Sequence, residues 1–248
     1  MCGPVSINAA HWMKTSEKRM AERDTVNNHA ACWALQAAEL ARLIGDQETR
    51  EEMRTQYKTL FVPGRRALDG SFPKELARTK SYSYSIFNFD IMATLCQSLP
   101  GDWPSLYSFV LPGGRGICKA AAFLYRYLQD KRTWPYKQDV EHFASLPVRS
   151  PGLRFCGLAC HHQEYLQLWT KLNPDPTDPE IIRNFPIRQS LLWVNPRSRS
   201  IRKNYEAVTR HRRISTARRV PDHCACSPFA DSPTASRCGF NRGAGDRR

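Results

Sequence analysis

Residues 117–128, Ile117-Cys-Lys-Ala-Ala-Ala-Phe-Leu-Tyr-Arg-Tyr-Leu128, carry the clearest structural pattern in this chain of 248 residues. Counted from Ile117, apolar side chains recur at i, i+3, i+4, i+7 and i+11, which places them on one face of an α-helix. The preceding segment, Leu111-Pro-Gly-Gly-Arg-Gly116, is rich in glycine and has no Lys-Ser/Thr pair after it. It therefore predicts a tight turn rather than a phosphate-binding loop. We expect an amphipathic helix that begins where this turn ends.

Helical spacing of apolar residues extends over most of the chain before residue 195. From Ala30 to Ile44 apolar side chains recur every three or four positions, and Gly45 is a natural helix end. No segment reads as a convincing paired strand. Helices joined by loops of several residues predict an all-α fold built from layers of packed helices. We expect the remaining helices over Ala9–Arg23, Gln47–Leu60, Ile86–Leu99 and Phe155–Leu172.

The composition limits the class of protein. A chain of 248 residues with 41% hydrophobic content can bury one sizeable core. It has no apolar run near the ~20 residues that a membrane-spanning helix needs, so we expect no membrane partner. The first residues, Met1-Cys-Gly-Pro-Val-Ser-Ile-Asn8, lack the basic start and the apolar stretch of a secretory signal peptide.

The composition changes abruptly after Val194. Residues 195–248 contain 13 Lys and Arg against 4 Asp and Glu, a net charge of +9 within the chain total of +14. Basic clusters such as Arg210-His-Arg-Arg213 lie among Ser, Pro and Gly with little apolar periodicity, which predicts a disordered tail. We expect one folded domain over residues 1–194 and a basic tail over residues 195–248. Such a tail would attract nucleic acid non-specifically, and the chain shows no recognised nucleic-acid-binding fold.

The chain has nine cysteines, an odd number, so they cannot all pair with one another. Those between residues 32 and 160 fall mostly on apolar helical faces, and we expect them to be free, buried thiols. Cys156 and Cys160 share a face of a predicted helix and are followed by His161 and His162. Their spacing does not match a paired zinc-ligand framework. We expect no metal site and no cofactor.

Two polar stretches are candidates for chemistry. Asn27-Asn28-His29 directly precedes a predicted helix. An Asn there can cap the helix by accepting a free backbone N–H; alternatively, the amide and the imidazole lie where a helix N-terminus already favours a carboxylate. The second stretch, Asp69-Gly-Ser-Phe-Pro-Lys-Glu-Leu-Ala-Arg-Thr-Lys-Ser-Tyr-Ser-Tyr-Ser85, places Arg78, Tyr82 and Tyr84 on a connection between helices. Such connections often hold functional side chains, although these tyrosines could also pack on a neighbouring helix.

Together these stretches resemble the alginate lyase family of polysaccharide lyases, including its glucuronan-cleaving relatives. The resemblance continues through Leu111–Ile117, Asp130-Lys-Arg-Thr-Trp-Pro135 and Pro186-Ile-Arg-Gln-Ser-Leu-Leu-Trp-Val194, and it covers residues 10–194 approximately. It implies an (α/α) toroid of antiparallel helix pairs. Family members carry further toroid helices before the Asn-Asn-His segment. The resemblance therefore implies an incomplete toroid that is truncated at its N-terminus and followed by an unrelated tail.

The resemblance also implies roles for individual residues. Asn28 and His29 would neutralise the carboxylate of a uronic acid, with help from Arg78. Tyr84 would move protons. β-Elimination needs such groups because removing the C5 proton beside a carboxylate builds up negative charge, and the departing 4-oxygen must be protonated. The same motifs imply substrate-binding roles for Asn27, Lys80, Tyr82 and Arg115, with Tyr82 as the alternative to Tyr84.

The sequence therefore predicts a polysaccharide lyase for an anionic polysaccharide of the alginate or glucuronan type. Its family resemblance implies an extracellular or periplasmic location. Two other hypotheses stay open. The chain is a non-catalytic lyase fragment if missing helices complete the substrate groove, or a basic nucleic-acid-binding protein that acts through its Arg-rich tail.

Overall fold

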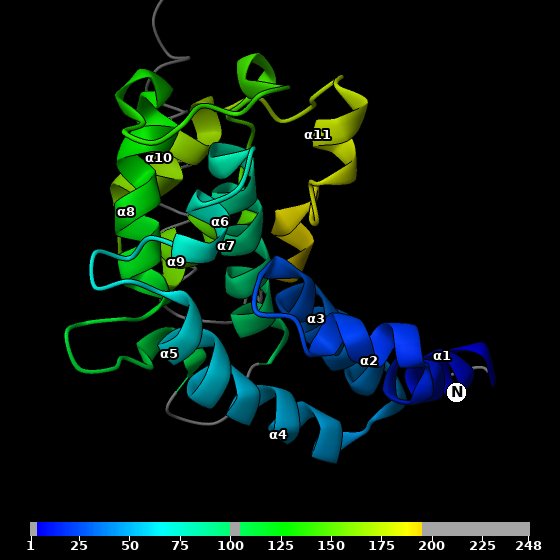
Figure 1. Cartoon of the computed structure of the whole chain (residues 1–248). Helices are drawn as coiled ribbons and strands as arrows, with labels where there is room; N and C mark the ends of the chain where they lie inside the picture. The colour runs from blue at the N-terminus through cyan, green and yellow to red at the C-terminus, as the bar shows by residue number, and fades with distance from the viewer. Residues whose placement is uncertain (1–3, 100–104, 195–248) are drawn as a thin grey trace, which may run out of the picture. The chain divides into compact units, whose positions relative to one another are not determined.

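The computed structural model describes residues 4–99 and 105–194, and its regular structure in these ranges is helical (Figure 1). Among these residues no β-strand forms, and only two isolated bridges pair backbone segments. The all-α expectation is confirmed. No helix in the described ranges is both long and apolar enough to span a membrane. The described helices are α1 (Pro4–Thr15), α2 (Glu17–Arg23), α3 (Asn28–Ile44), α4 (Gln47–Gln56), the π-helix η1 (Tyr57–Phe61), α5 (Val62–Arg65), α6 (Pro73–Leu76), α7 (Ser81–Ser98), η2 (Leu106–Ser108), α8 (Ile117–Gln129), η3 (Lys131–Thr133), η4 (Phe143–Ser145), α9 (Pro151–Ala159), α10 (Gln163–Lys171), α11 (Pro179–Arg183) and η5 (Ser190–Trp193).

The tail predicted over residues 195–248 lies outside the described residues, so its predicted disorder stays a prediction. The domain boundary expected after Val194 likewise stays a prediction.

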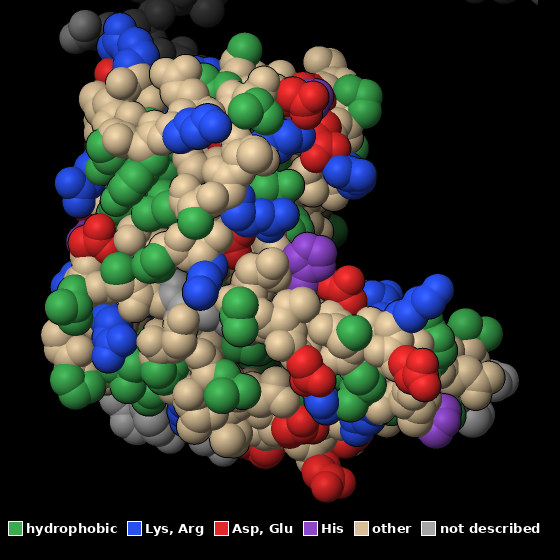
Figure 2. Space-filling view, viewed as in Figure 1, with side chains coloured by type: hydrophobic (Ala, Val, Ile, Leu, Met, Phe, Trp, Pro, Cys, Tyr) green, Lys and Arg blue, Asp and Glu red, His purple; other side chains and the backbone are tan. Residues whose placement is uncertain are grey.

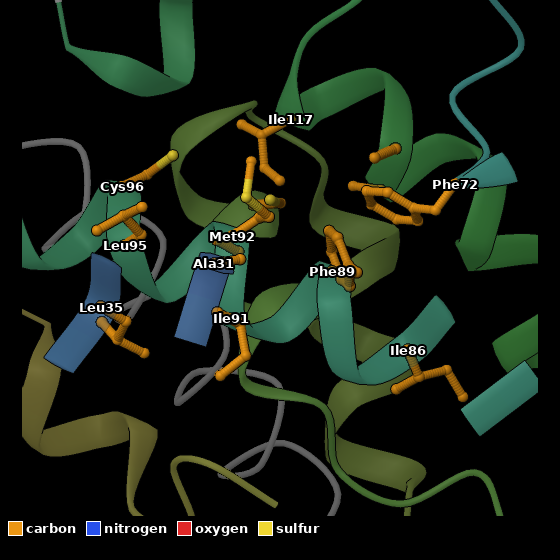
Figure 3. Packing of buried hydrophobic residues seen from close by; sticks show 14 of the residues in the cluster. Ala31, Leu35, Phe72, Ile86, Phe89, Ile91, Met92, Leu95, Cys96 and Ile117 are labelled. Carbon is orange, nitrogen blue, oxygen red and sulfur yellow. The ribbon is translucent and has the colours of Figure 1, made fainter. Parts of the chain in front are cut away.

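Helix α7 is the central element of the core, and it packs against α3, α8 and α9 (Figure 1). Its Phe89, Met92 and Leu95 are fully buried. Figure 3 shows Ala31 and Leu35 of α3 beside these α7 side chains. Burying one large apolar side chain stabilises a fold by about 1.5–3 kcal/mol, so packing holds α7 from several sides. Residues at the N-terminal end of α7 are therefore attached to a rigid scaffold.

Helix α7 begins at Ser81, earlier than the expected Ile86, so the segment predicted as a connection forms its first turn. The first N–H groups of a helix have no partner within the helix. Here the carboxylate of Asp139 accepts two of them, from Tyr82 at 2.7 Å and from Ser83 at 2.9 Å. The expectation of a loop is wrong because the group that caps this helix comes from a distant part of the chain.

Three other expected helices are divided in the structure. Ala9–Arg23 breaks at Ser16, whose extended backbone separates α1 from α2. Gln47–Leu60 becomes α4 followed by η1. Phe155–Leu172 breaks into α9 and α10 near His161, whose φ of 61° is left-handed. Apolar residues continue on both sides of each break, so their spacing does not mark it.

Helix ends that are set by residues close by in the chain agree with the sequence-based expectations. Asn27 caps α3 by accepting the N–H of His29 at 3.0 Å, as the capping hypothesis expected. Gly45 ends α3 with a φ of 80°, a conformation that glycine adopts readily. Helix α8 begins at Ile117 after a turn in which Gly113 has a φ of 81°, which confirms the expected turn and helix start.

A disulfide joins Cys118 in α8 to Cys160, the residue that follows α9. The expectation of free thiols is therefore wrong for these two residues, while Cys96 and Cys156 are free and buried. The paired Cα atoms are 5.9 Å apart although 42 positions separate them in sequence. This distance lies within the range that a disulfide bridges, and only the packing of α8 against α9 creates it.

Candidate functional site

The side chain of Arg78 connects groups that the sequence analysis nominated separately. Its Nη1 donates to Oδ1 of Asn28 at 3.3 Å and lies 3.4 Å from Oε2 of Glu75. Its guanidinium carbon lies 3.6 Å from the centroid of the Tyr84 ring, which places a cation on the ring face. Asn28, Arg78 and Tyr84 are thus brought together from the start of α3, the α6–α7 connection and the first turn of α7.

Glu75 is a member of this group that the sequence analysis missed. It is buried, and its Oε1 accepts the backbone N–H of Asn28 at 2.8 Å. One carboxylate therefore holds both the N-terminus of α3 and the guanidinium of Arg78. Glu75 precedes Arg78 by three residues, a spacing visible in the sequence, but its burial is not. We define Asn28, Glu75, Arg78 and Tyr84 as the Arg78 cluster.

The Asn28 side chain is buried, and its oxygen is turned toward Arg78. The Asn27 oxygen caps the helix. His29 follows at the surface, with 46% of its side chain exposed, and its Nδ1 is 2.6 Å from Oε2 of Glu22 in α2. The imidazole thus lies beside the Arg78 cluster in the chain but is bound to α2. A polymer can reach it, because nearly half of the side chain is exposed.

Lys80 provides a second cation next to Tyr84. Its Nζ is 2.9 Å from Oε2 of Glu141 and 3.9 Å from Oε1 of Glu180. The hydrogen bond to Glu141 raises the pKa of Lys80 against the effect of burial, with smaller contributions from Glu180 and Tyr84. Lys80 and Tyr84 also line one cavity of about 30 Å³ between α7, α11 and the loop after residue 136.

Two residues expected to bind substrate make their side-chain contacts within the fold. Tyr82 is fully buried, and its hydroxyl donates to the backbone oxygen of Tyr127 at 2.8 Å. Burial raises the pKa of Tyr82, and its ring meets Trp134 edge-on at 5.1 Å. The Tyr82 hydroxyl therefore lies inside the core, away from the surface where a substrate would bind, and its expected substrate contact stays an untested prediction. Arg115 donates from Nη1 to the backbone oxygen of Pro63 at 3.3 Å, so it ties its turn to α5 rather than to the Arg78 cluster.

The surface near the site is hollowed between the regions of α11 and of α2 with α3 (Figure 2). The Glu22–His29 pair comes from α2 and α3, and the Lys80–Glu180 pair comes from the start of α7 and from α11. In residues 4–99 and 105–194 no three His, Cys, Asp or Glu side chains gather in a way that could hold a metal ion. The side chains that gather here are an amide, an imidazole, a phenol and two cations, together with the carboxylates that pair with the imidazole and the cations.

Comparison with known proteins bears on this arrangement. Residues 8–134 match the family model described as alginate lyase. A solved alginate lyase from Bacteroides ovatus is similar in fold, with a TM-score of 0.59 and 23% sequence identity over 73% of this chain and 48% of that chain. The expectation of an (α/α) toroid fold is confirmed by this likeness. No curated protein matches the chain.

The chain spans about half the length of that solved structure. The family match includes every member of the Arg78 cluster and His29. Because the match extends over more than half of the sequence, the chain belongs to the alginate lyase family.

Proposed function

We propose that this protein is a polysaccharide lyase that cleaves a uronic-acid polymer of the alginate or glucuronan type by β-elimination. The observation that carries the proposal is the contact of one guanidinium, that of Arg78, with both the Asn28 amide and the Tyr84 ring. A carboxylate-binding group and a proton-transferring group are thereby joined through one cation.

In this mechanism Asn28 and His29 neutralise the substrate carboxylate. Since the Asn28 oxygen accepts from Arg78, its NH₂ end is the end left to donate to a substrate oxygen. The dipole at the start of α3 adds to this stabilisation. Neutralising the carboxylate matters most when the C5 proton leaves, because negative charge then spreads onto that group.

Tyr84 removes the C5 proton in the proposed reaction. The electron pair of the C5–H bond forms the C4–C5 double bond, the C4–O4 bond breaks, and the departing oxygen takes up a proton. The cation of Arg78 lies on the face of the Tyr84 ring, and that of Lys80 lines the same cavity as Tyr84. A single tyrosine can serve as base and then as acid, because the proton that it accepts is the one that the oxygen needs.

The disulfide Cys118–Cys160 supports the proposal that the protein works outside the cell or in the periplasm. Disulfides persist in such oxidising compartments and are rare in the cytosol. Polyuronate polymers would be met there.

The test is a pair of tyrosine variants assayed on polymannuronate, polyguluronate and polyglucuronate. Product formation is followed by the ultraviolet absorbance of the new double bond. Tyr84→Phe keeps the ring that stacks on Arg78 but removes the proton carrier, so activity should fall on the order of 10²-fold or more. The control Tyr125→Phe removes the hydroxyl of a partly exposed tyrosine in α8 and should retain activity.

Each outcome has a distinct meaning. Retained activity in Tyr84→Phe would refute the role of Tyr84 while leaving the lyase in place. An unmodified, folded chain that is inactive on all three polymers would reject the lyase function and favour a non-catalytic role.

A further inference from the structure

A histidine–aspartate pair lies next to Tyr84, beyond the residues 8–134 that match the family model. Nδ1 of His142 is 2.7 Å from Oδ2 of Asp178, and Ser145 Oγ donates to the same oxygen at 2.8 Å. The other Asp178 oxygen accepts the N–H of Glu180 at 3.0 Å and caps α11. These contacts, led by the one with His142, lower the pKa of Asp178 to about 2. The carboxylate therefore stays charged and orients the imidazole.

His142 and Tyr84 line the same cavity of about 30 Å³. A space of this size admits one or two water-sized groups, so a sugar ring must stay at its mouth while a single oxygen projects inward. Asp178 occupies Nδ1 of His142, which leaves Nε2 as the nitrogen that can exchange a proton with such an oxygen.

The loop that carries His142 is tied to the end of α7 that carries Tyr84. Asp139 of this loop accepts two N–H groups from the first turn of α7. On its other side, Nζ of Lys131 donates to three backbone oxygens of the loop at 2.6, 2.8 and 3.0 Å. His142 itself has a φ of 60°, a left-handed conformation that a non-glycine residue keeps only when its surroundings hold it. The ring is thus fixed in place relative to Tyr84.

We propose that His142 is the general acid of the elimination and that Tyr84 is its base. The inference rests on the proposed lyase function and divides between two residues the proton transfers that one tyrosine could perform. Tyr84 takes the C5 proton, the C4–C5 double bond forms, and the C4–O4 bond breaks. Nε2 of His142 gives its proton to O4, which becomes a hydroxyl group. Tyr84 then releases its proton to water, and His142 takes one up.

The test compares two leaving groups. A uronate with a nitrophenyl group on O4 releases a nitrophenolate, which needs no proton from an acid, whereas the polymer releases a sugar oxygen that does. His142→Gln should lose on the order of 10²-fold in kcat on the polymer and nearly nothing on the nitrophenyl substrate. Tyr84→Phe should lose activity on both. The matched control is His162→Gln, because His162, the residue before α10, forms a similar and exposed pair with Glu164 at 2.7 Å. This variant should be fully active.

Asp178→Asn keeps the cap of α11 and leaves His142 in place, so it covers the case in which His142→Gln fails to fold. It should show the same dependence on leaving group with a smaller loss, on the order of 10-fold. Equal losses on both substrates, or full polymer activity in both variants, would overturn the role of His142. Those results are distinct from failure of the lyase function, in which the unmodified chain itself is inactive on both substrates.

Discussion

Asp90 offers the sharpest test of the energetics of this fold. It lies in α7, is buried, and its Oδ1 accepts hydrogen bonds from Ser150 Oγ and from the Gly152 N–H at 3.0 Å. Burial raises the pKa of this carboxyl group from 3.8 to about 7, although both hydrogen bonds act in the opposite direction. Asp90→Asn should therefore remove a large pH dependence of stability.

The sign follows from proton binding. Below about pH 4 Asp90 is protonated in both the folded and the unfolded chain. Between about pH 4 and pH 7 the folded chain keeps the proton and the unfolded chain has lost it, so the free energy of unfolding falls as the pH rises. Above about pH 7 the group is ionised in both states, and its effect no longer changes.

The size follows from the same values. A difference of about 3 between the folded and unfolded pKa corresponds to about 4 kcal/mol over the whole window. Between pH 5 and pH 8 the share is about 3 kcal/mol, because only the interval from pH 5 to pH 7 contributes. An Asn oxygen can still accept both hydrogen bonds. Any fixed cost of its NH₂ group is the same at both pH values and cancels from the comparison.

The assay is urea unfolding of the unmodified chain and of Asp90→Asn at pH 5 and pH 8. The unmodified chain should lose about 3 kcal/mol more than the variant between these conditions. Asp130→Asn is the control: the pKa of Asp130 is lowered by its hydrogen bond to Arg132, so its titration lies below pH 5. If the unmodified chain and Asp90→Asn lose the same amount, Asp90 is ionised in the folded state, and the argument from burial is refuted.

Two further predictions concern the stability of the fold: one tests the disulfide and the other tests a glycine turn. Replacing Cys118 and Cys160 with Ser should lower the free energy of unfolding by about 4 kcal/mol, because the disulfide closes a loop of 42 positions; equal urea midpoints with and without the disulfide would contradict this. Gly70→Ala should lower the melting temperature far more than Gly45→Ala. Both glycines have positive φ, but a Cβ at Gly70 would lie 2.4 Å from the backbone oxygen of Lys119. A Cβ at Gly45 would have no atom within 4 Å. Similar melting temperatures for the two variants would show that the clash is relieved by movement of the turn.

The local sequence determined the helical class and several helix ends. The apolar stripe that begins at Ile117, the Asn27 cap and the Gly45 stop all agree with the structure. These signals are readable because helix periodicity and capping depend on residues within about four positions of one another. The motif resemblance likewise identified Asn28, Arg78 and Tyr84, which the structure brings together.

Tertiary structure alone decided which of these residues face the recess. Tyr82 and Tyr84 look equivalent in sequence, but α7 begins early because Asp139 caps it, and one tyrosine then points into the core while the other meets Arg78. The burial of Glu75 and the pairing of His142 with Asp178 are hidden for the same reason. Burial and the partners of a charged group are set by segments that are distant in sequence, and a residue's own neighbours carry no record of them.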